Sequence, residues 1–392
     1  MQSWQQRYAV SGPCSVKVEQ MDGAVRITGS EEPAVTVKAT WPGEGRIEDR
    51  LEVAVGTNGI RLMVKPYRAG ILGLFNRDTL LDLELTVPVG SRVEIQSGSG
   101  PVAVERTAGP VELECGSGRV TLVGVGRAQI ESGSGSVQLR EVNGPVTAET
   151  GSGRIDLEAA LGPVRLQTGS GSVAVRRVGR GLEVETASGS IAAADVEGGV
   201  KLESGSGSIV ASRIVADDLD VETGSGSVRM QALDVRSLSV ETGSGGVELE
   251  LLRVHPHGDL KVETGSGRVA LTLPPDAGLN LEMETHGRVD FGGLPVRVLR
   301  QEDEEIRAVM GAGGPTFVIE TGSGSVSLRP LQGADASSDP EVAAARLAEL
   351  VKDDPALEQS EQLTRILQMV REGKLTVEEA EQILRALDGE EG

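Results

Sequence analysis

The sequence "ETGSGSV" at Glu222 to Val228 returns almost unchanged at Glu320 to Val326, and close variants such as "ESGSGSV" occupy much of the chain. The first glycine of each copy, or the residue in its place, serves as a marker. Most markers are about 18 residues apart, and a regular period of this length indicates a repeat protein. The markers are Gly98, Gly116, Gly133, Gly151, Gly169, Ala187, Gly205, Gly224, Gly243, Gly265, His286 and Gly322.

Aliphatic residues hold fixed positions around each marker, for example Ile95 and Leu113 three residues before it and Val102 and Val120 four residues after it. Apolar and polar residues alternate on both sides, which predicts two short β-strands joined by a Gly-Ser-Gly corner. One such unit cannot bury its apolar rows, but copies stacked one after another at about 4.8 Å can. The sequence therefore predicts a mainly β protein, a single-chain parallel β-solenoid (β-helix) of about 18-residue coils. We expect the corner glycines to avoid Cβ clashes and unfavourable φ values.

The flanks of this repeat differ from it. Residues 1–92 contain strand-like runs and five of the seven aromatic residues but no marker, which indicates irregular β coils and a cap. Residues 93–330 form the predicted regular solenoid, and residues 331–339 read as a linker. A helical period begins at Pro340, so residues 340–392 are predicted to be a short helical module.

The predicted helical module carries apolar stripes on a segment too small to bury them well. We therefore expect it to mediate contact with a protein partner or with a second copy. The candidate partner-binding residues are Ile366, Leu367, Val370, Ile383, Leu384 and Leu387.

Composition limits the classes of partner. A formal net charge of −21 argues against binding to nucleic acid, whose phosphates need Lys and Arg, and against anionic lipid. No apolar run reaches the length of a membrane span, so no direct membrane insertion is expected. The start "MQSWQQRYAV" lacks a signal segment, so a cytoplasmic protein is predicted, with envelope association through a partner as the alternative. Cys14 and Cys115 suggest no disulfide framework.

The coils "VETGSGSVRM" and "IETGSGSVSL" resemble the bacterial putative-adhesin family, a β-strand repeat domain of unknown function, over about residues 15–330. The tail "ILQMVREGKLTVEEAEQILRAL" is similar to the short helical domains often attached to such proteins. The resemblance implies the solenoid fold and a link to bacterial cell-envelope stress. Adhesion is not carried over, because the sequence shows no export signal.

Catalytic motifs are absent from the sequence. It contains no GxGxxG, no Walker-type GxxxxGK[ST] and no GxSxG, so neither an enzyme nor a cofactor is predicted. His255 and His257 are expected in a solvated loop, since a metal site would need two further ligands. Cys115 is expected to fill a ladder position. The acidic insertion from Glu302 to Glu305 is predicted to be a solvated bulge, with partner docking as the alternative.

The residue two before each marker is Glu or Gln in every copy, and it is expected to point outward. In-register stacking would place successive carboxylates about 4.8 Å apart. One interpretation is a solubilising stripe, and the other is a ladder that collects divalent cations such as calcium. The weak metal candidates are Glu185, Glu203, Glu222, Glu241, Glu263 and Glu284.

These observations predict a non-catalytic β-solenoid scaffold or binding protein, linked to envelope stress or assembly, whose helical tail mediates oligomerisation or partner binding. One alternative is a carbohydrate-active β-helix enzyme, although only Phe291 and Phe317 could serve as aromatic platforms in residues 93–330. Another is a repetitive surface that binds cations or ice. Its hydroxyl column would be Thr150, Thr168, Thr186, Thr223, Thr242 and Thr264.

Overall fold

The computed structural model describes residues 1–56, 58–65 and 80–331. Residues Met1–Pro330 form one compact unit. The helices predicted for residues 340–392 and most of the predicted linker lie outside the described residues. Within the described residues the only helix is a short 3-10 turn, η1 (Ile47–Asp49), and the rest of the regular structure is β.

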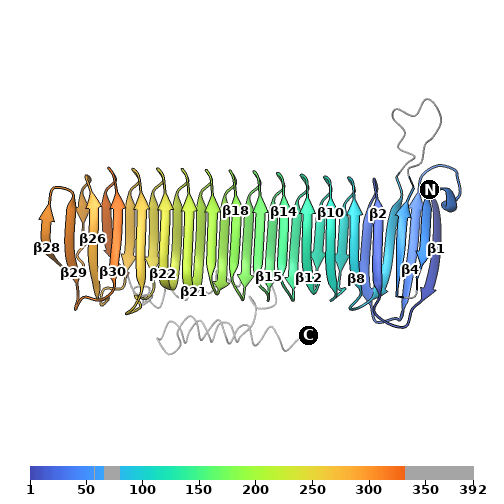
Figure 1. The fold of residues 1–392 in the computed structure, drawn as a ribbon, viewed down its shortest axis with the longest axis horizontal. Helices are drawn as coiled ribbons and strands as arrows, with labels where there is room; N and C mark the ends of the chain where they lie inside the picture. The colour runs from blue at the N-terminus through green and yellow to red at the C-terminus, as the bar shows by residue number, and fades with distance from the viewer. Residues whose placement is uncertain (57, 66–79, 332–392) are drawn as a thin grey trace, which may run out of the picture. The chain divides into compact units, whose positions relative to one another are not determined.

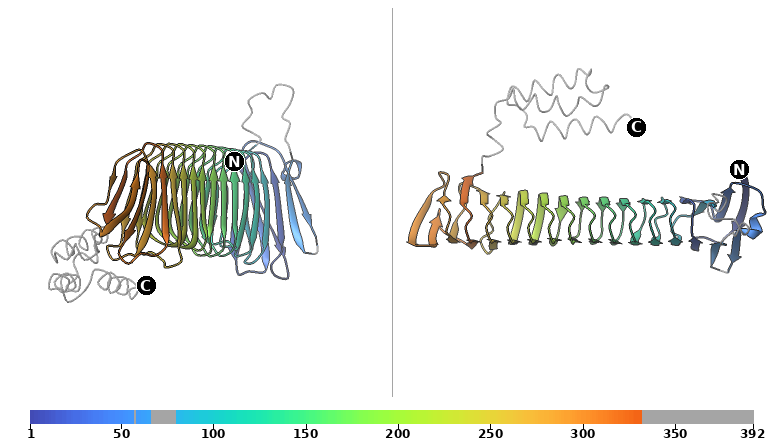
Figure 2. Two further views of the ribbon diagram at one scale, coloured as in Figure 1. Left: turned by 60° about the vertical axis from the view of Figure 1, so that its left-hand side comes forward. Right: turned by 90° about the horizontal axis from the view of Figure 1, so that it is seen from above.

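The regular part of the chain is a parallel β-solenoid of about nine turns, with about 19 residues in each turn. Every turn contributes one strand to each of two layers, which Figures 1 and 2 show as a long stack of strands. The first layer begins with β8 (Arg92–Ser97), β10 (Pro110–Cys115), β12 (Arg127–Ser132), β14 (Val146–Thr150), β16 (Val164–Thr168), β18 (Leu182–Thr186) and β20 (Val200–Ser204). The second begins with β9 (Val102–Glu105), β11 (Val120–Val123), β13 (Val137–Val142), β15 (Ile155–Ala160), β17 (Val173–Val178) and β19 (Ile191–Glu197).

Two later strands run through both layers, because the chain stays extended from one layer into the other. They are β21 (Ile209–Thr223) and β22 (Val228–Thr242). The last sequential turn then adds β23 (Val247–Leu251), β24 (Asp259–Thr264) and β25 (Val269–Leu273).

The core consists of the aliphatic rows that the repeat predicted. Leu113 pairs in register with Ile95 on one side and with Ile130 on the other, and all three are buried. Each fully buried Val, Leu or Ile contributes about 1.5–3 kcal/mol. Because every coil places the same kind of residue at the same height, the rows merge into one continuous core.

The corner glycines are required by close stacking, not by backbone angle. A Cβ atom added to Gly118 would lie 1.8 Å from the carbonyl oxygen of Gly100, and one added to Gly226 would lie 1.9 Å from that of Gly207. Neither glycine of these corners has a positive φ. The expectation of unfavourable φ values was therefore wrong for these corners, whereas the expected Cβ clash is present.

Left-handed backbone occurs instead at the opposite bend of each coil, eight residues after the marker. Eight successive coils place a residue there with φ between 52° and 66°, and only one of the eight is glycine. The conformation costs about 1–2 kcal/mol for a residue with a Cβ atom. These residues are Arg106, Gly124, Glu141, Ala159, Arg177, Asp195, Arg213 and Ala232.

The C-terminal end of the solenoid does not follow sequence order. Its strands are β26 (Leu279–Thr285), β27 (Val289–Asp290), β28 (Val296–Glu302), β29 (Glu305–Met310), β30 (Thr316–Thr321) and β31 (Val326–Pro330). Strand β30 pairs in parallel with β24 on one side and with β26 on the other, and β31 lies between β25 and β27. The last coil in sequence is therefore inserted before the previous one, and the expected sequential stacking is wrong here.

The hairpin β28–β29 explains this insertion. Strand β29 pairs antiparallel with β26, so β26 must be the outermost parallel strand of its layer. The inner side of β26 is then filled by β30. Glu302 to Glu304 are exposed at the turn of this hairpin, so the acidic insertion belongs to an end-covering hairpin and is not a bulge within a coil.

The N-terminal end is interleaved in the same way. It contains β1 (Gln2–Ala9), β2 (Ser15–Gln20), β3 (Val25–Ser30), β4 (Ala34–Trp41), β5 (Leu51–Val55), β6 (Gly59–Val64) and β7 (Asp82–Pro88). Strand β2 lies between β6 and β8, and β3 lies between β7 and β9. Antiparallel strands complete this end, since β5 pairs with β6 and β4 lies between β7 and β1.

Candidate functional site

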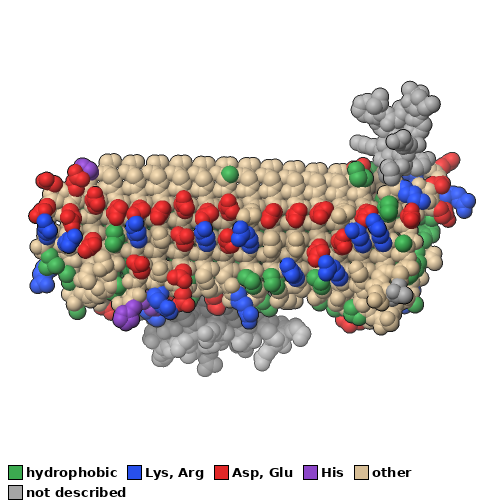
Figure 3. All heavy atoms as spheres, in the orientation of Figure 1, with side chains coloured by type: hydrophobic (Ala, Val, Ile, Leu, Met, Phe, Trp, Pro, Cys, Tyr) green, Lys and Arg blue, Asp and Glu red, His purple; other side chains and the backbone are tan. Residues whose placement is uncertain are grey.

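The most repetitive surface feature is the row of Glu and Gln side chains two residues before each marker, which we call the carboxylate ladder. Its members are exposed or half-buried, and neighbouring members are in register, as with Glu203 and Glu222. Figure 3 shows an acidic row that runs along the solenoid below a band with few charged side chains. The ladder consists of Gln96, Glu114, Glu131, Glu149, Gln167, Glu185, Glu203, Glu222, Glu241, Glu263, Glu320 and Glu284.

The spatial order of the ladder differs from its sequence order at one end. Glu320 is in register with Glu263 on one side and with Glu284 on the other. The cation candidates Glu263 and Glu284 are therefore not neighbours, although Glu185, Glu203, Glu222, Glu241 and Glu263 do follow one another. Seven successive carboxylates, ending with Glu320 and Glu284, run along this part of the face.

A shallow groove follows the ladder. It is lined by the ladder residues, by the Ser or Thr that comes next in each coil, and by the first corner glycine. One stretch has a volume of about 1620 Å³ and runs from Glu19 to Gly224, and a second of about 610 Å³ continues past Glu222 to Glu284. Met21, Met63 and Val64 line its N-terminal end.

The hydroxyl column under this groove serves the fold. The Thr242 hydroxyl accepts a hydrogen bond from the Gly245 N–H at 3.1 Å and donates one to the Gly226 carbonyl oxygen of the preceding coil at 3.0 Å. Thr242 is only 5% exposed. The Thr column is therefore buried and hydrogen-bonded, and it is not the exposed row of hydroxyls that an ice-binding surface needs. The buried Cys115 occupies the same column, where its Sγ accepts the Gly118 N–H at 3.2 Å.

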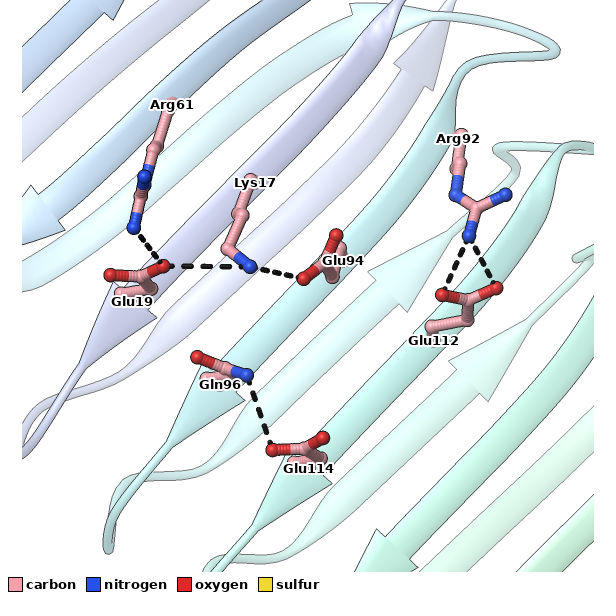
Figure 4. Close-up of polar contacts among 8 residues, drawn as sticks. All are labelled: Lys17, Glu19, Arg61, Arg92, Glu94, Gln96, Glu112 and Glu114. Carbon is pink, nitrogen blue, oxygen red and sulfur yellow. Dashed lines mark hydrogen bonds and ion pairs between the residues drawn. The ribbon is translucent and has the colours of Figure 1, made fainter.

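Glu19 extends the row beyond the ladder, because it is in register with Gln96, and cationic side chains partly neutralise the row at this end, as Figure 4 shows. Glu19 pairs with Arg61 at 2.6 Å and with Lys17 at 3.5 Å. Lys17 also hydrogen-bonds Glu94, and this bond holds the pKa of Lys17 above its ordinary value. In the next coil an amide takes the place of a carboxylate, because Gln96 is in register with Glu19 and donates to Glu114 of the following coil at 3.2 Å.

Farther along, two carboxylates of the ladder have an ion-pair partner among the described residues. Lys201 pairs with Glu203 at 2.6 Å, and Lys261 pairs with Glu263. Within the described residues, no cation lies within ion-pair distance of Glu131, Glu149, Glu222 or Glu241.

The carboxyl group of Glu320 belongs to a ladder position between two other carboxylates, Glu263 and Glu284. Partial burial, followed by the negative charge of Glu263, raises the pKa of Glu320 above its ordinary value, and Glu284 adds to the effect. Lys261 opposes the rise because its positive charge favours the ionised carboxylate. Burial of this carboxyl and the charges of its two ladder neighbours therefore both disfavour its ionised form.

The arrangement does not assemble a metal centre in the part of the chain that the structure describes. No group of three or more His, Cys, Asp and Glu residues there could hold an ion. His255 lies 2.7 Å from Asp234 through Nε2, so this residue of the predicted solvated loop has a carboxylate partner. Phe317 is fully buried and Phe291 is partly buried against the core, so neither forms an exposed platform for a sugar.

Sequence families agree with the fold and with the tail. The toastrack DUF4097 family matches residues 144–329, and a SHOCT-like domain matches residues 361–392. The resemblance to the putative-adhesin repeats and to their attached helical domains is thereby confirmed. The candidate partner-binding residues from Ile366 to Leu387 fall inside the second match but outside the described residues.

The solved structures that are similar to the chain include the following three. A putative cell adhesion protein from Clostridium sporogenes has 10% identity, with 84% of this chain and 99% of that chain covered and a TM-score of 0.19. A putative adhesin from Bacteroides fragilis has 11% identity, coverage of 83% and 97%, and a TM-score of 0.20. A putative lipid binding protein from Parabacteroides distasonis has 13% identity, coverage of 83% and 96%, and a TM-score of 0.23.

No curated protein matches the chain. Among the described residues, no helix has the length and apolar character needed to cross a membrane.

Proposed function

We propose that this chain, whose residues 144–329 match the toastrack DUF4097 family, is a non-catalytic scaffold. It presents a rigid, repetitive surface and recruits a protein through its tail. The observation that carries this proposal is the uniformity of the solenoid. Most coils repeat an outward carboxylate, a buried hydroxyl and a Gly-Ser-Gly corner. Catalysis needs different groups that converge on one point, whereas a uniform row suits spacing and binding.

The tail supports the recruiting half of the proposal. Its apolar stripes belong to a segment of about 50 residues, which is marginal as an independent domain. The match to a SHOCT-like domain over residues 361–392 covers all six candidate partner-binding residues. Contact with a second copy or with another protein would bury these stripes. The ladder supports the scaffold half, because repelling carboxylates keep neighbouring solenoids from associating sideways.

Deletion of residues 334–392 tests the recruiting role. The full chain and the truncated chain are compared by analytical ultracentrifugation and by circular dichroism over a range of concentrations. If the tail self-associates, the full chain has a mass that is a multiple of its own monomer mass, the truncated chain has its monomer mass, and both have the same β signal. The same number of chains per particle for both proteins would exclude self-association through the tail, and a lost β signal would make the tail an obligatory part of the fold.

The finer proposal is a role in bacterial cell-envelope stress or assembly, in a cytoplasmic protein that reaches the envelope through its partner. It rests on the similarity of the tail to SHOCT-like domains. Its test is the abundance of the protein before and after envelope stress, compared with its abundance after an unrelated stress such as heat. An unchanged level after envelope stress would contradict this role.

A further inference from the structure

The two ends of the chain leave the solenoid in different ways. Among the described strands, the N-terminal strand β1 pairs only with β4. It has no buried residue, and Trp4 and Tyr8 are only partly buried. The C-terminal strands β30 and β31 lie inside the stack, with partners on both sides. Residue Leu331, where the tail begins, therefore follows an interior coil, although it is close to the end of the solenoid in sequence.

The interior position of β30 is reinforced by its side chains. Phe317 and Ile319 are fully buried between the equivalent residues of β24 and β26. The Thr321 hydroxyl donates to the Gly267 carbonyl oxygen at 3.1 Å, and the Thr285 hydroxyl donates to the Gly324 carbonyl oxygen at 2.8 Å. Both faces of the inserted coil are thus joined to neighbouring coils by backbone pairing, apolar contact and hydroxyl bonds.

The outer strands depend on the inserted coil in turn. Among the described strands, β28 and β29 pair with the rest of the solenoid only through β26, and β26 pairs with it through β30. Fraying from the outside would therefore begin at β28, whose residues are mostly exposed, and would leave β30 and β31 in place. The coil β30–β31, which precedes the tail, would therefore be released after β28, β29 and β26.

We infer that the inserted coil β30–β31 is a mechanical anchor, so that tension applied through the tail is resisted by the whole terminal group of strands instead of peeling one strand. Removing β30 would take away the support of β26, β28 and β29, so the group should be released together. The N-terminus lacks this device, because β1 can separate without disturbing any other pairing. This inference uses only the strand order of residues 1–330 and does not depend on what the tail binds.

Single-molecule pulling on the full chain tests the anchor. One handle is attached at Arg180→Cys, an exposed bend in the middle of the solenoid, and the other at either Leu331→Cys or Ser3→Cys. Both proteins carry Cys14→Ala and Cys115→Ser so that the handles attach only at the chosen sites. The Ser3 handle is the matched control, because it pulls on an edge strand of the same solenoid.

Pulling at residue 331 is expected to give a first release of the whole segment from about residue 274 to residue 330, on the order of 190 Å of chain. Pulling at residue 3 should give a first release of β1 alone, on the order of 30 Å, at a lower force. A first release on the order of 50 Å from residue 331, which corresponds to β30 and β31 alone, would overturn the inference. So would a first rupture force at residue 331 that is no higher than the force at residue 3.

Discussion

Thr321 donates a hydrogen bond from its hydroxyl to the carbonyl oxygen of Gly267, 3.1 Å away, although 54 residues separate the two in sequence. The equivalent bond in the coils from Thr150 to Thr264, such as Thr242 to Gly226, joins neighbours that are one repeat apart. The Thr321 bond therefore shows that the last coil is inserted beside the coil of Gly265, while the intervening segment forms the outer end of the solenoid.

Corner stacking predicts that two adjacent glycines respond oppositely to alanine. A Cβ atom at Gly245 would lie 1.8 Å from the Gly226 carbonyl oxygen, whereas one at Gly246 would meet its nearest neighbour at 3.5 Å. We expect Gly245→Ala to destabilise the protein by at least about 1–3 kcal/mol, the usual cost of overpacking. Gly246→Ala should change stability by less than about 1 kcal/mol. Denaturant unfolding of both variants checks this, and equal losses would contradict the stacking account.

The buried hydroxyl column predicts a selective effect at Thr242. Thr242→Val keeps the shape but leaves the Gly245 N–H and the Gly226 carbonyl oxygen without their side-chain partner. The expected loss is about 1–3 kcal/mol, the cost of unsatisfied buried groups. Thr242→Ser is the matched control, since Ser204 makes the same two bonds in its own coil. If the valine and serine variants unfold at the same denaturant concentration, the hydroxyl does not support the corner.

Glu320→Gln is expected to stabilise the protein at neutral pH. A carboxyl group whose folded pKa is raised contributes stability below its unfolded pKa, and this contribution is lost as pH rises through the folded pKa. The amide removes repulsion of about 0.9 kcal/mol per neighbour before screening, so the gain at pH 7 should be at most on the order of 1 kcal/mol. It should vanish below pH 4, where the wild-type carboxyl is protonated. Melting temperatures at both pH values measure it.

Glu84→Gln is the control with the opposite sign. A hydrogen bond from Lys38 lowers the pKa of Glu84, so this carboxylate contributes stability above its unfolded pKa and loses it as pH falls through the folded pKa. The substitution should therefore destabilise the protein slightly at pH 7, within the range of about 0.2–1 kcal/mol for exposed ion pairs, and have little effect at low pH. A loss for Glu320→Gln at pH 7 would refute the electrostatic description of the ladder, and a gain for Glu84→Gln would refute that of the Lys38–Glu84 pair.

Calcium is expected to stabilise the protein no more than other salts at the same ionic strength. The described residues contain no cluster of three metal-ligating groups, and Lys201 and Lys261 already occupy Glu203 and Glu263. Screening of the ladder should raise the melting temperature equally for calcium, magnesium and sodium salts matched in ionic strength. A larger rise with calcium alone would establish the cation-binding alternative.

The sequence predicted the repeat well because strand position and burial follow directly from the alternation of residues such as Ile95 and Val102. Coil order could not be read in the same way. Leu260, Leu281 and Phe317 are all apolar at one height of the stack, so the pattern accepts β26 or β30 equally well beside β24. The order of β26 and β30 is instead set by the hairpin β28–β29, because β29 pairs with β26. The repeat pattern of the sequence does not indicate this pairing.

The left-handed backbone conformation eight residues after the marker was also not predicted from the sequence. Residues such as Arg177 and Asp195 adopt it although glycine would be the expected type, because pairing on both sides fixes the backbone of each coil. The carboxylate ladder was predictable in composition, while its order depended on the position of Glu320.

A disulfide test of coil order examines the central claim, an interleaved solenoid end, most directly. With Cys14→Ala and Cys115→Ser as background, Ala270→Cys is combined with either Ser327→Cys or Asp290→Cys. Residues 270 and 327 are register partners, as are 290 and 327, which places residue 290 two strands and about 9.6 Å from residue 270. Mild oxidation should link 270 to 327 and not 270 to 290, since bridged Cα atoms lie within about 7 Å. A disulfide between 270 and 290, with none between 270 and 327, would mean sequential stacking and would contradict the account.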